Sequence, residues 1–164
     1  MIIGRKKLLE MYPNFKNDIA ENGIDLRVGK IQEMVIDNKV VGCVDDQKML
    51  PNLKDVEFNP VNKSYELKPF HWYFVTIDRK MNIPDGYTQI YLLRSTFTRC
   101  GLMLGSSVGD NGYNGTLMMT LFVACPQIIN IGKNERIIQA LTIKNDGTAT
   151  KYNGDYQNDD IYKE

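Results

Sequence analysis

The sequence is poor in the residues that build metal sites and disulfide frameworks. Its 164 residues include one histidine, His71, and three cysteines, Cys43, Cys100 and Cys125. The cysteines are widely spaced, odd in number and form no C-x-x-C pair. The single histidine cannot complete a zinc site with them on any usual spacing. We therefore expect reduced, partly buried thiols and a structural histidine.

Net charge and long apolar runs are also missing. Twenty Lys and Arg balance twenty Asp and Glu, which removes the basic surplus on which nucleic-acid and membrane-surface binding depend. No apolar stretch approaches the roughly 20 residues of a membrane span, and the N-terminus lacks a secretory hydrophobic region. We expect a cytoplasmic protein that binds neither nucleic acid nor membrane.

The pattern of short segments predicts a single all-β domain. A chain of this size buries roughly 70% of its unfolded surface, and 43% hydrophobic with 24% charged residues is an ordinary globular composition. Short strands separated by polar turns, about 8 to 12 residues apart, are typical of a β-barrel or sandwich. A doubly wound nucleotide fold is disfavoured, because neither a G-x-x-x-x-G-K-[ST] loop nor strand–helix alternation is present.

The elements can be placed along the chain from apolar spacing. A short helix is expected at residues 4–12, ended by Pro13. Strands are expected at residues 24–28, 70–77, 87–93, 117–123 and 136–143. The run 117–123 is continuously apolar, as in a strand buried on both faces. Residues 144–164 are polar, and we expect a mobile tail there unless a ligand or a neighbouring subunit orders it.

Functional groups are densest between Arg94 and Thr120, where the pattern predicts strand, tight turn and strand. Among the side chains of this stretch are two guanidinium groups, hydroxyls, a carboxylate and an aromatic ring, from Arg94, Arg99, Ser95, Thr96, Thr98, Asp110 and Tyr113. Cations, hydroxyls and loop N–H groups suit phosphate oxygens, and a carboxylate can move a proton. The pattern indicates a small phosphorylated ligand, with an ordinary ion pair as the alternative role for each arginine.

Four short segments stand in an order that characterises one superfamily. They are IDLRVG at 24–29, RSTFTR at 94–99, DNGYNG at 110–115 and NERIIQ at 134–139, and with the intervening strands they span roughly residues 20–143. In these segments the chain resembles the trimeric dUTP diphosphatases (dUTPases) and dCTP deaminases. The short N-terminal helix and the Arg-Ser-x-x-x-Arg form of the second segment resemble the deaminase branch and its archaeal-type dUTPase relatives. The resemblance implies a homotrimer of distorted jelly-roll subunits with shared active sites, residues 1–164 forming one domain.

The resemblance also implies a ligand and its chemistry. It implies dUTP as substrate, with Mg²⁺ bound to the triphosphate, as Mg²⁺ commonly is in such sites. Asp110 matches the aspartate that orients and deprotonates the water attacking the α-phosphate. Tyr113 matches the aromatic residue that packs against the deoxyribose. The backbone of the hairpin from Ser107 to Gly115 would read the uracil edge.

Further positions follow from the same resemblance. Ser95 and Gln139 match phosphate-contacting positions. Arg94 and Arg99 would support the triphosphate or cross a subunit boundary, and Asp25 would hold the architecture of the site. The alternative role for Asp25 is a strand-edge carboxylate paired with a nearby Arg or Lys.

The end of the chain departs from the dUTPase pattern. The Arg- and Gly-rich closing tail of many dUTPases is missing, and the sequence KYNGDYQNDD at residues 151–160 is nearer to the tail of the deaminase branch. Tyr156 or Gln157 would cap the phosphates, or else Lys151 or Tyr152; the resemblance leaves the choice open.

One position separates the two activities of the superfamily. Its deaminases carry a glutamate five residues beyond the glycine of the third segment, and the residue here is Thr120. A threonine hydroxyl cannot serve as the general base of a deamination. The resemblance therefore favours a diphosphatase that converts dUTP and water to dUMP and pyrophosphate. A dCTP deaminase, a bifunctional enzyme and a non-catalytic nucleotide-binding regulator are the alternatives.

Overall fold

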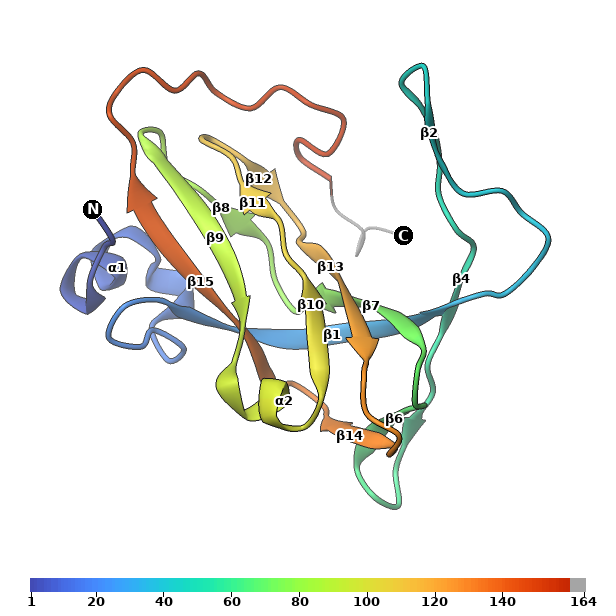
Figure 1. Cartoon of the computed structure of the whole chain (residues 1–164). Coiled ribbons are helices and arrows are strands. Elements are labelled where there is room, and N and C mark those ends of the chain that lie inside the picture. Colours follow the sequence, from blue (N-terminus) through green and yellow to red (C-terminus); the bar gives the residue numbers. More distant parts are fainter. Residues whose placement is uncertain (160–164) are drawn as a thin grey trace.

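Strand β1 lies at the centre of an eight-stranded antiparallel sheet in the computed structural model, which describes residues 1–159 (Figure 1). The main sheet has the order β10-β13-β7-β1-β15-β9-β11, with β4 also paired to β1. Its strands are β1 Ile24–Met34, β4 Leu53–Asp55, β7 Trp72–Ile77, β9 Tyr87–Leu93, β10 Leu102–Gly105, β11 Val108–Gly109, β13 Met118–Val123 and β15 Arg136–Lys144.

Three small sheets and three short helical segments make up the other regular elements of residues 1–159. The small sheets pair β12 with β8, β14 with β6 and β5, and β2 with β3. Their strands are β2 Gly42–Val44, β3 Gln47–Met49, β5 Phe58–Asn59, β6 Ser64–Leu67, β8 Met81–Asn82, β12 Asn114–Gly115 and β14 Ile129–Gly132. The helical segments are α1 Arg5–Met11, the 3₁₀ turn η1 Pro13–Phe15 and α2 Ser95–Arg99.

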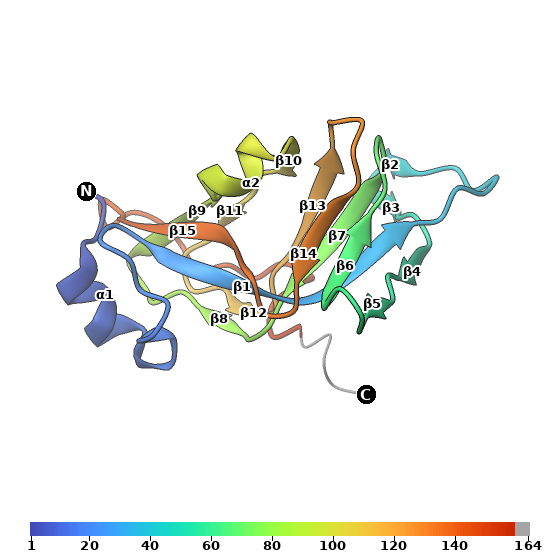
Figure 2. The same ribbon diagram turned by 90° about the horizontal axis from the view of Figure 1, so that it is seen from below.

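The main sheet curls because β1 changes partner along its length. Its first residues pair with β15 and the rest with β7, and the register shifts between Leu26 and Arg27 and again between Val28 and Lys30. Such irregularities increase the local twist and bend the strand. The sheet therefore curls into a half-barrel, which Figure 2 shows from below. Ile24, Leu26 and Val28 are fully buried inside it.

The predicted all-β class is confirmed, and several predicted elements occur where expected. β9 spans the predicted residues 87–93, β15 extends the predicted strand 136–143 by one residue, and α1 lies within the predicted helix 4–12. Among the described residues, no helix is both long and apolar enough to span a membrane.

The segment after Arg94 was predicted to be a strand, and this is wrong. Residues 95–99 form the helix α2, in which the N–H groups of Phe97 and Thr98 both bond to the carbonyl oxygen of Arg94. Phe97 is buried, so its tertiary packing overrides the strand preference of the neighbouring threonines.

Two burial predictions are also wrong. β13 alternates between buried positions and positions that are exposed or half-buried, with Met118 39% exposed, because it lies in a sheet that buries one face. Of the three thiols, Cys43 and Cys100 are exposed and only Cys125 is partly buried. Cys43 lies on the outer β2–β3 hairpin, and Cys100 lies at the C-terminal end of α2.

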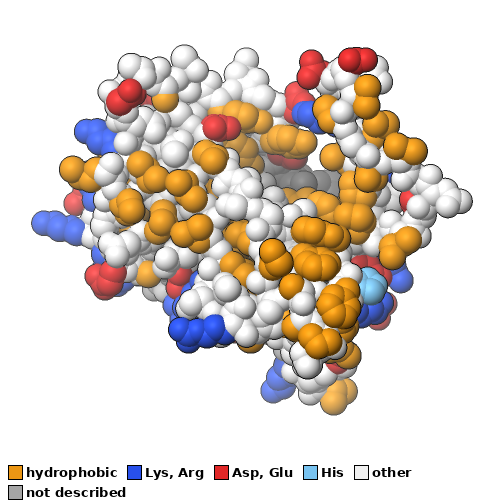
Figure 3. Space-filling view, in the orientation of Figure 1, with side chains coloured by type: hydrophobic (Ala, Val, Ile, Leu, Met, Phe, Trp, Pro, Cys, Tyr) orange, Lys and Arg blue, Asp and Glu red, His pale blue; other side chains and the backbone are white. Residues whose placement is uncertain are grey.

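The other face of this part of the sheet exposes a row of apolar side chains. Met103 on β10 lies opposite Phe122 on β13, which in turn lies opposite Trp72 on β7. The rings of Trp72 and Phe122 are 4.9 Å apart, while Met103 remains 59% and Trp72 45% exposed. Figure 3 shows hydrophobic side chains gathered on this side of the molecule. Contiguous apolar patches of this kind mark interaction sites.

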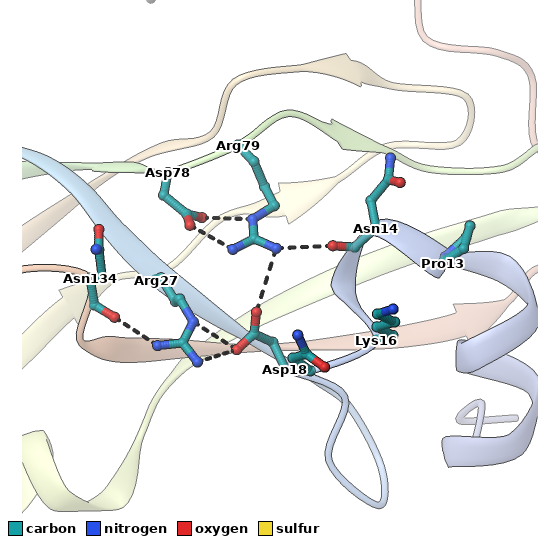
Figure 4. A pocket seen from close by; sticks show the side chains of 9 residues that line it. Pro13, Asn14, Lys16, Asp18, Arg27, Asp78, Arg79 and Asn134 are labelled. Atoms are coloured by element: carbon teal, nitrogen blue, oxygen red, sulfur yellow. Dashed lines mark hydrogen bonds and ion pairs between the residues drawn. The ribbon is translucent and has the colours of Figure 1, made fainter.

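A charged cluster ties the N-terminal segment to the sheet. It lines a polar pocket of about 640 Å³ beside η1 (Figure 4). The side chain of Asp18 is 3% exposed and lies between two guanidinium groups: Arg27 Nε at 2.7 Å from its Oδ1 and Arg79 Nη1 at 3.5 Å from its Oδ2. Arg79 also makes two bonds to Asp78. Because the N–H of Asp25 donates to the carbonyl of Asp18 at 2.7 Å, the cluster also supports the strand that carries Asp25.

Replacing Asp18 with asparagine is expected to lower the free energy of unfolding by about 2 kcal/mol, because hydrogen bonds to charged groups contribute roughly 1.5–3 kcal/mol. Urea denaturation measures the change. The matched control is Asp55→Asn, which breaks an ion pair to Lys30 whose side chains are 64% and 43% exposed. It should cost less than about 1 kcal/mol. Equal losses in the two variants would contradict the structural role of Asp18.

Candidate active site

The first group of predicted site residues meets around Asp25. This carboxylate is buried, and Asp25 lies opposite Gln139 in the pairing of β1 with β15. Gln139 Nε2 donates to Asp25 Oδ1 at 3.2 Å, and Arg94 Nη2 lies 3.5 Å from Asp25 Oδ2. Arg136 Nη1 stands 3.8 Å from the same oxygen. The alternative role for Asp25, a carboxylate paired with a nearby Arg or Lys, therefore agrees with its two arginine partners, and Asp25 is 4% exposed.

Ser95 and Arg99 extend this group on α2. Arg94 precedes the helix, and its N–H bonds to the carbonyl of Ile137 on β15 at 2.9 Å. Both Ser95 and Arg99 are exposed, and within residues 1–159 Arg99 makes no ion pair. We call Asp25, Arg94, Ser95, Arg99 and Gln139 the arginine group; it presents two cations, a hydroxyl and an amide at one end of the sheet.

The second group lies where the β10–β13 hairpin divides. The two strands pair as far as Gly105 opposite Thr120. Beyond that point the two arms of the hairpin separate. The arm that follows β10 forms β11, which pairs with β9, and the arm that precedes β13 forms β12, which pairs with β8. The loop between the arms carries Ser107 and Asp110, both exposed, and the buried Tyr113.

Thr120 stands at the point of division. A Cβ atom on Gly105 would approach Thr120 Oγ1 to 2.0 Å, so the threonine side chain lies directly against the glycine backbone. A side chain at position 105 would therefore displace the hydroxyl of Thr120. The position that distinguishes the two activities therefore carries a hydroxyl that packs against the opposite strand.

Tyr113 points into the loop and not into solvent. Its hydroxyl donates to the carbonyl of Thr116 at 3.1 Å, and its ring meets the ring of Tyr152 edge-on, with centroids 5.7 Å apart. Burial, followed by the negative charges of Asp159 and of ionised Tyr152, raises the pKa of Tyr113 to about 12.

The described part of the tail lies against this loop. The amide of Gln157 donates to the carbonyl of Gly112 at 3.0 Å and accepts the N–H of Asn114 at 3.0 Å. The ring of Tyr156 is 45% exposed and lies 5.0 Å from the ammonium group of Lys48 on β3. Gln157 thus bonds to backbone groups of the hairpin that was predicted to read a base. Residues 160–164 of the predicted tail lie outside the described residues.

One chain does not bring Asp110 and Arg94 together. We call Ser107, Asp110, Tyr113, Tyr156 and Gln157 the loop group. Gly109, next to Asp110, pairs with Gln89 near the beginning of β9, while Arg94 immediately follows β9. Asp110 and Arg94 therefore lie about 20 Å apart along the strand, at about 3.3 Å per residue.

Three residues near these groups were not singled out from the sequence. Arg136 lies within the fourth segment, and its charge next to Gln139 could have identified it. Asn111 lies between Asp110 and Tyr113 and is buried; a polar residue in a glycine-rich loop gives no signal of burial. Lys48 contacts the tail from a hairpin more than 100 residues away, since 107 positions separate it from Asp155, and no local pattern indicates this.

Comparison with known proteins gives one family and near full-length relatives. Residues 3–144 match the family described as dCTP deaminase-like. A probable deoxyuridine 5′-triphosphate nucleotidohydrolase from Methanothermobacter thermautotrophicus is 36% identical over 96% of this chain and 99% of its own length. A dCTP deaminase from Pyrobaculum arsenaticum is 27% identical over 94% of this chain and 84% of its own.

A solved structure shares the fold. The crystal structure of 2′-deoxycytidine 5′-triphosphate deaminase from Agrobacterium tumefaciens superposes with a TM-score of 0.65 at 15% identity. The match covers 86% of this chain and 47% of that one, so the chain spans about half the length of the deaminase structure. At this identity the likeness establishes the fold alone.

The raised pKa of Tyr113 predicts a loss of stability in alkali. The pKa of this tyrosine is near 10 in the unfolded chain and about 12 in the folded protein. Its contribution to the stability of the folded state is therefore fully present below pH 10. This contribution is lost as the pH rises from 10 to 12. Urea denaturation across that range should therefore show a smaller decline for Tyr113→Phe than for the unaltered protein. An identical decline would contradict the assignment.

Proposed function

The chain belongs to the dCTP deaminase-like family, and we propose that it hydrolyses dUTP to dUMP and pyrophosphate. The observation that carries the proposal is the pair Asp110 and Thr120. Asp110 presents an exposed carboxylate for hydrolysis. Thr120, which lies where strands β10 and β13 separate, carries a hydroxyl at the position where a deaminase needs a glutamate. The name of the Methanothermobacter relative supports the same activity.

Asp110 is proposed to act on the attacking water. Its side chain is exposed and, in the part of the chain that the structure describes, makes no hydrogen bond or ion pair, so its oxygens are open to a water molecule. The carboxylate takes a proton as the water oxygen bonds to the α-phosphorus. The bond from that phosphorus to the bridging oxygen of the β-phosphate breaks, and pyrophosphate leaves. Positioning and charge neutralisation supply most of the catalysis in such a transfer.

The remaining residues are proposed to bind the substrate. Tyr113 packs against the deoxyribose, and Ser107 belongs to the hairpin that reads the uracil. Ser95 and Gln139 contact phosphate oxygens, with Arg94 and Arg99 neutralising their charge. Tyr156 and Gln157 close over the triphosphate after leaving their present contacts.

We propose Mg²⁺ as the cofactor. Among the described residues no three His, Cys, Asp or Glu side chains come together as a metal site. The proposal therefore assigns the ion to phosphate oxygens and water, the ligands that Mg²⁺ prefers when it accompanies a nucleotide. Bound there, it would neutralise charge that develops on the leaving pyrophosphate.

A homotrimer with shared active sites is part of the proposal. Asp110 and Arg94 lie toward opposite ends of β9, so the phosphates of a substrate that reacts at Asp110 need the arginine group of a neighbouring copy. The apolar row of Met103, Phe122 and Trp72, in which Met103 and Trp72 are exposed, offers a surface for such a contact.

The direct test is the product formed from each nucleotide. Purified protein with Mg²⁺ should convert dUTP to dUMP and pyrophosphate and leave dCTP unchanged, as separated by ion-exchange chromatography. Conversion of dCTP to dUTP or dUMP would instead establish a deaminase or a bifunctional enzyme, and the Pyrobaculum relative makes this the second candidate. Binding of either nucleotide without turnover would identify a non-catalytic regulator.

The paired variants for this test are Asp110→Asn and Asp146→Asn. The first should lower dUTP turnover by about 10²–10⁴-fold, the usual contribution of a positioned general base, with dUTP affinity kept. Asp146 is an exposed carboxylate whose one hydrogen-bond partner among the described residues is Thr148, so its variant should keep full turnover. Normal turnover in Asp110→Asn would rule out the mechanism.

Shared active sites predict complementation between two inactive variants. Asp110→Asn and Arg99→Ala chains should each have low activity alone. After unfolding together and reassembly, about a quarter of the sites should draw both intact residues from neighbouring chains and regain turnover. No recovery in mixed oligomers, verified by mass, would contradict sites that combine the two groups from different copies.

A further inference from the structure

Asn111 makes hydrogen bonds from all parts of its side-chain amide. It is 4% exposed. Its Oδ1 accepts the N–H of Gly86 at 2.7 Å. Its Nδ2 donates to Asp85 Oδ1 at 3.1 Å and to the carbonyl of Ala149 at 3.2 Å. Its own carbonyl accepts the N–H of Tyr152 at 2.8 Å.

These bonds join three segments that are distant in the sequence. Asp85 and Gly86 form the turn between β8 and β9, which is held in place because the carbonyl of Gly86 accepts the N–H of Asn145. Ala149 and Tyr152 belong to the tail. Asn111 therefore links the loop to a turn anchored on the sheet and to the segment that follows β15.

The neighbouring Asp110 has no such support of its own. Its side chain is exposed, and no hydrogen bond from another described side chain holds its carboxylate. The position of the carboxylate is therefore set by the loop backbone. Next to Asn111 that backbone turns through Gly112 at φ +72°, with the stem of Lys151 packed against it.

We propose that Asn111 is a positioning residue for Asp110 and that it couples the loop to the tail. The proposal rests on the proposed function, in which Asp110 acts on the attacking water. A misplacement of about 1 Å at a reacting group can cost about a hundredfold in rate, so a residue that holds the loop backbone affects turnover without touching the substrate.

The side chain of Asn111 must both accept and donate hydrogen bonds, which requires an amide. An aspartate of the same shape could still accept the N–H of Gly86, but it has no N–H to donate to Asp85 or Ala149. The donated bond from Asn111 is also the first cause, before the ammonium group of Lys151, that holds the pKa of Asp85 below its ordinary value. A carboxylate at position 111 would repel the negatively charged carboxylate of Asp85 and release the turn that carries it.

The test is Asn111→Asp. The value of kcat for dUTP should fall by about tenfold to a hundredfold, while KM changes by less than about threefold because the substrate-binding groups remain. Amide hydrogen exchange should become faster at residues 149–152. Asp85→Ala is a change at an exposed turn that removes one acceptor of Asn111, and it should lower kcat by a smaller factor. This variant decides the question if Asn111→Asp does not fold.

The matched control is Asn145→Ala. This asparagine holds the same turn through its backbone N–H, while its buried Nδ2 has no partner among the described residues. Its variant should keep kcat and the exchange rates of the tail. Faster exchange with unchanged kcat in Asn111→Asp would overturn the positioning role, and unchanged exchange would overturn the coupling. If the unaltered protein does not hydrolyse dUTP, the proposed function fails, while exchange in Asn111→Asp still decides the coupling.

Discussion

The pairing of β1 with two different partners is the constraint on which the rest of the structure depends. Along its first residues β1 pairs with β15, and after two register shifts it pairs with β7. Side chains alternate along a strand, so register decides which of them face the core. In this register Asp25 lies opposite Gln139 and within reach of Arg94. A slip of one residue would bury Arg27 in place of Leu26 and separate the arginine group.

The same sheet also keeps Asp110 and Arg94 apart. β9 runs between them, with the Asp110 loop beside the turn that precedes it and Arg94 immediately after it. A strand is a rigid spacer, so no rotamer change within one chain can close a gap of about 20 Å. The exposed apolar row on β7, β10 and β13 gives a physical route by which a second copy could supply what one chain lacks.

The loop and the tail show how an exposed catalytic candidate can still have a defined position. Asp110 itself is open to solvent, while Asn111 beside it is buried and fully hydrogen-bonded. The loop backbone is thereby attached to the sheet through Gly86 and to the tail through Ala149. Because Gln157 occupies backbone groups of the same loop, any ligand that uses those groups must first displace it.

The sequence by itself determined the all-β class, most strand positions and the residue type at the discriminating position. Apolar alternation locates β9 and β15 within a residue, since that signal is local. The order of four segments indicated the family, and Thr120 in place of a glutamate is a chemical fact that no fold can change. The helical turn at α2 escaped local analysis, because the burial of Phe97 outweighed the strand preference of its neighbours.

Only the tertiary structure decided which of these residues meet. Arg136 joins Asp25, and Lys48 reaches the tail, from positions more than 100 residues away in the chain, at separations of 111 and 107 (136 − 25 and 155 − 48). Asn111 became a link between a turn and the tail through bonds to residues 26 and 38 positions away. Such contacts depend on strand register and on the path of each loop. Neither is encoded in the spacing of nearby residues, because both follow from how the whole chain buries its apolar surface.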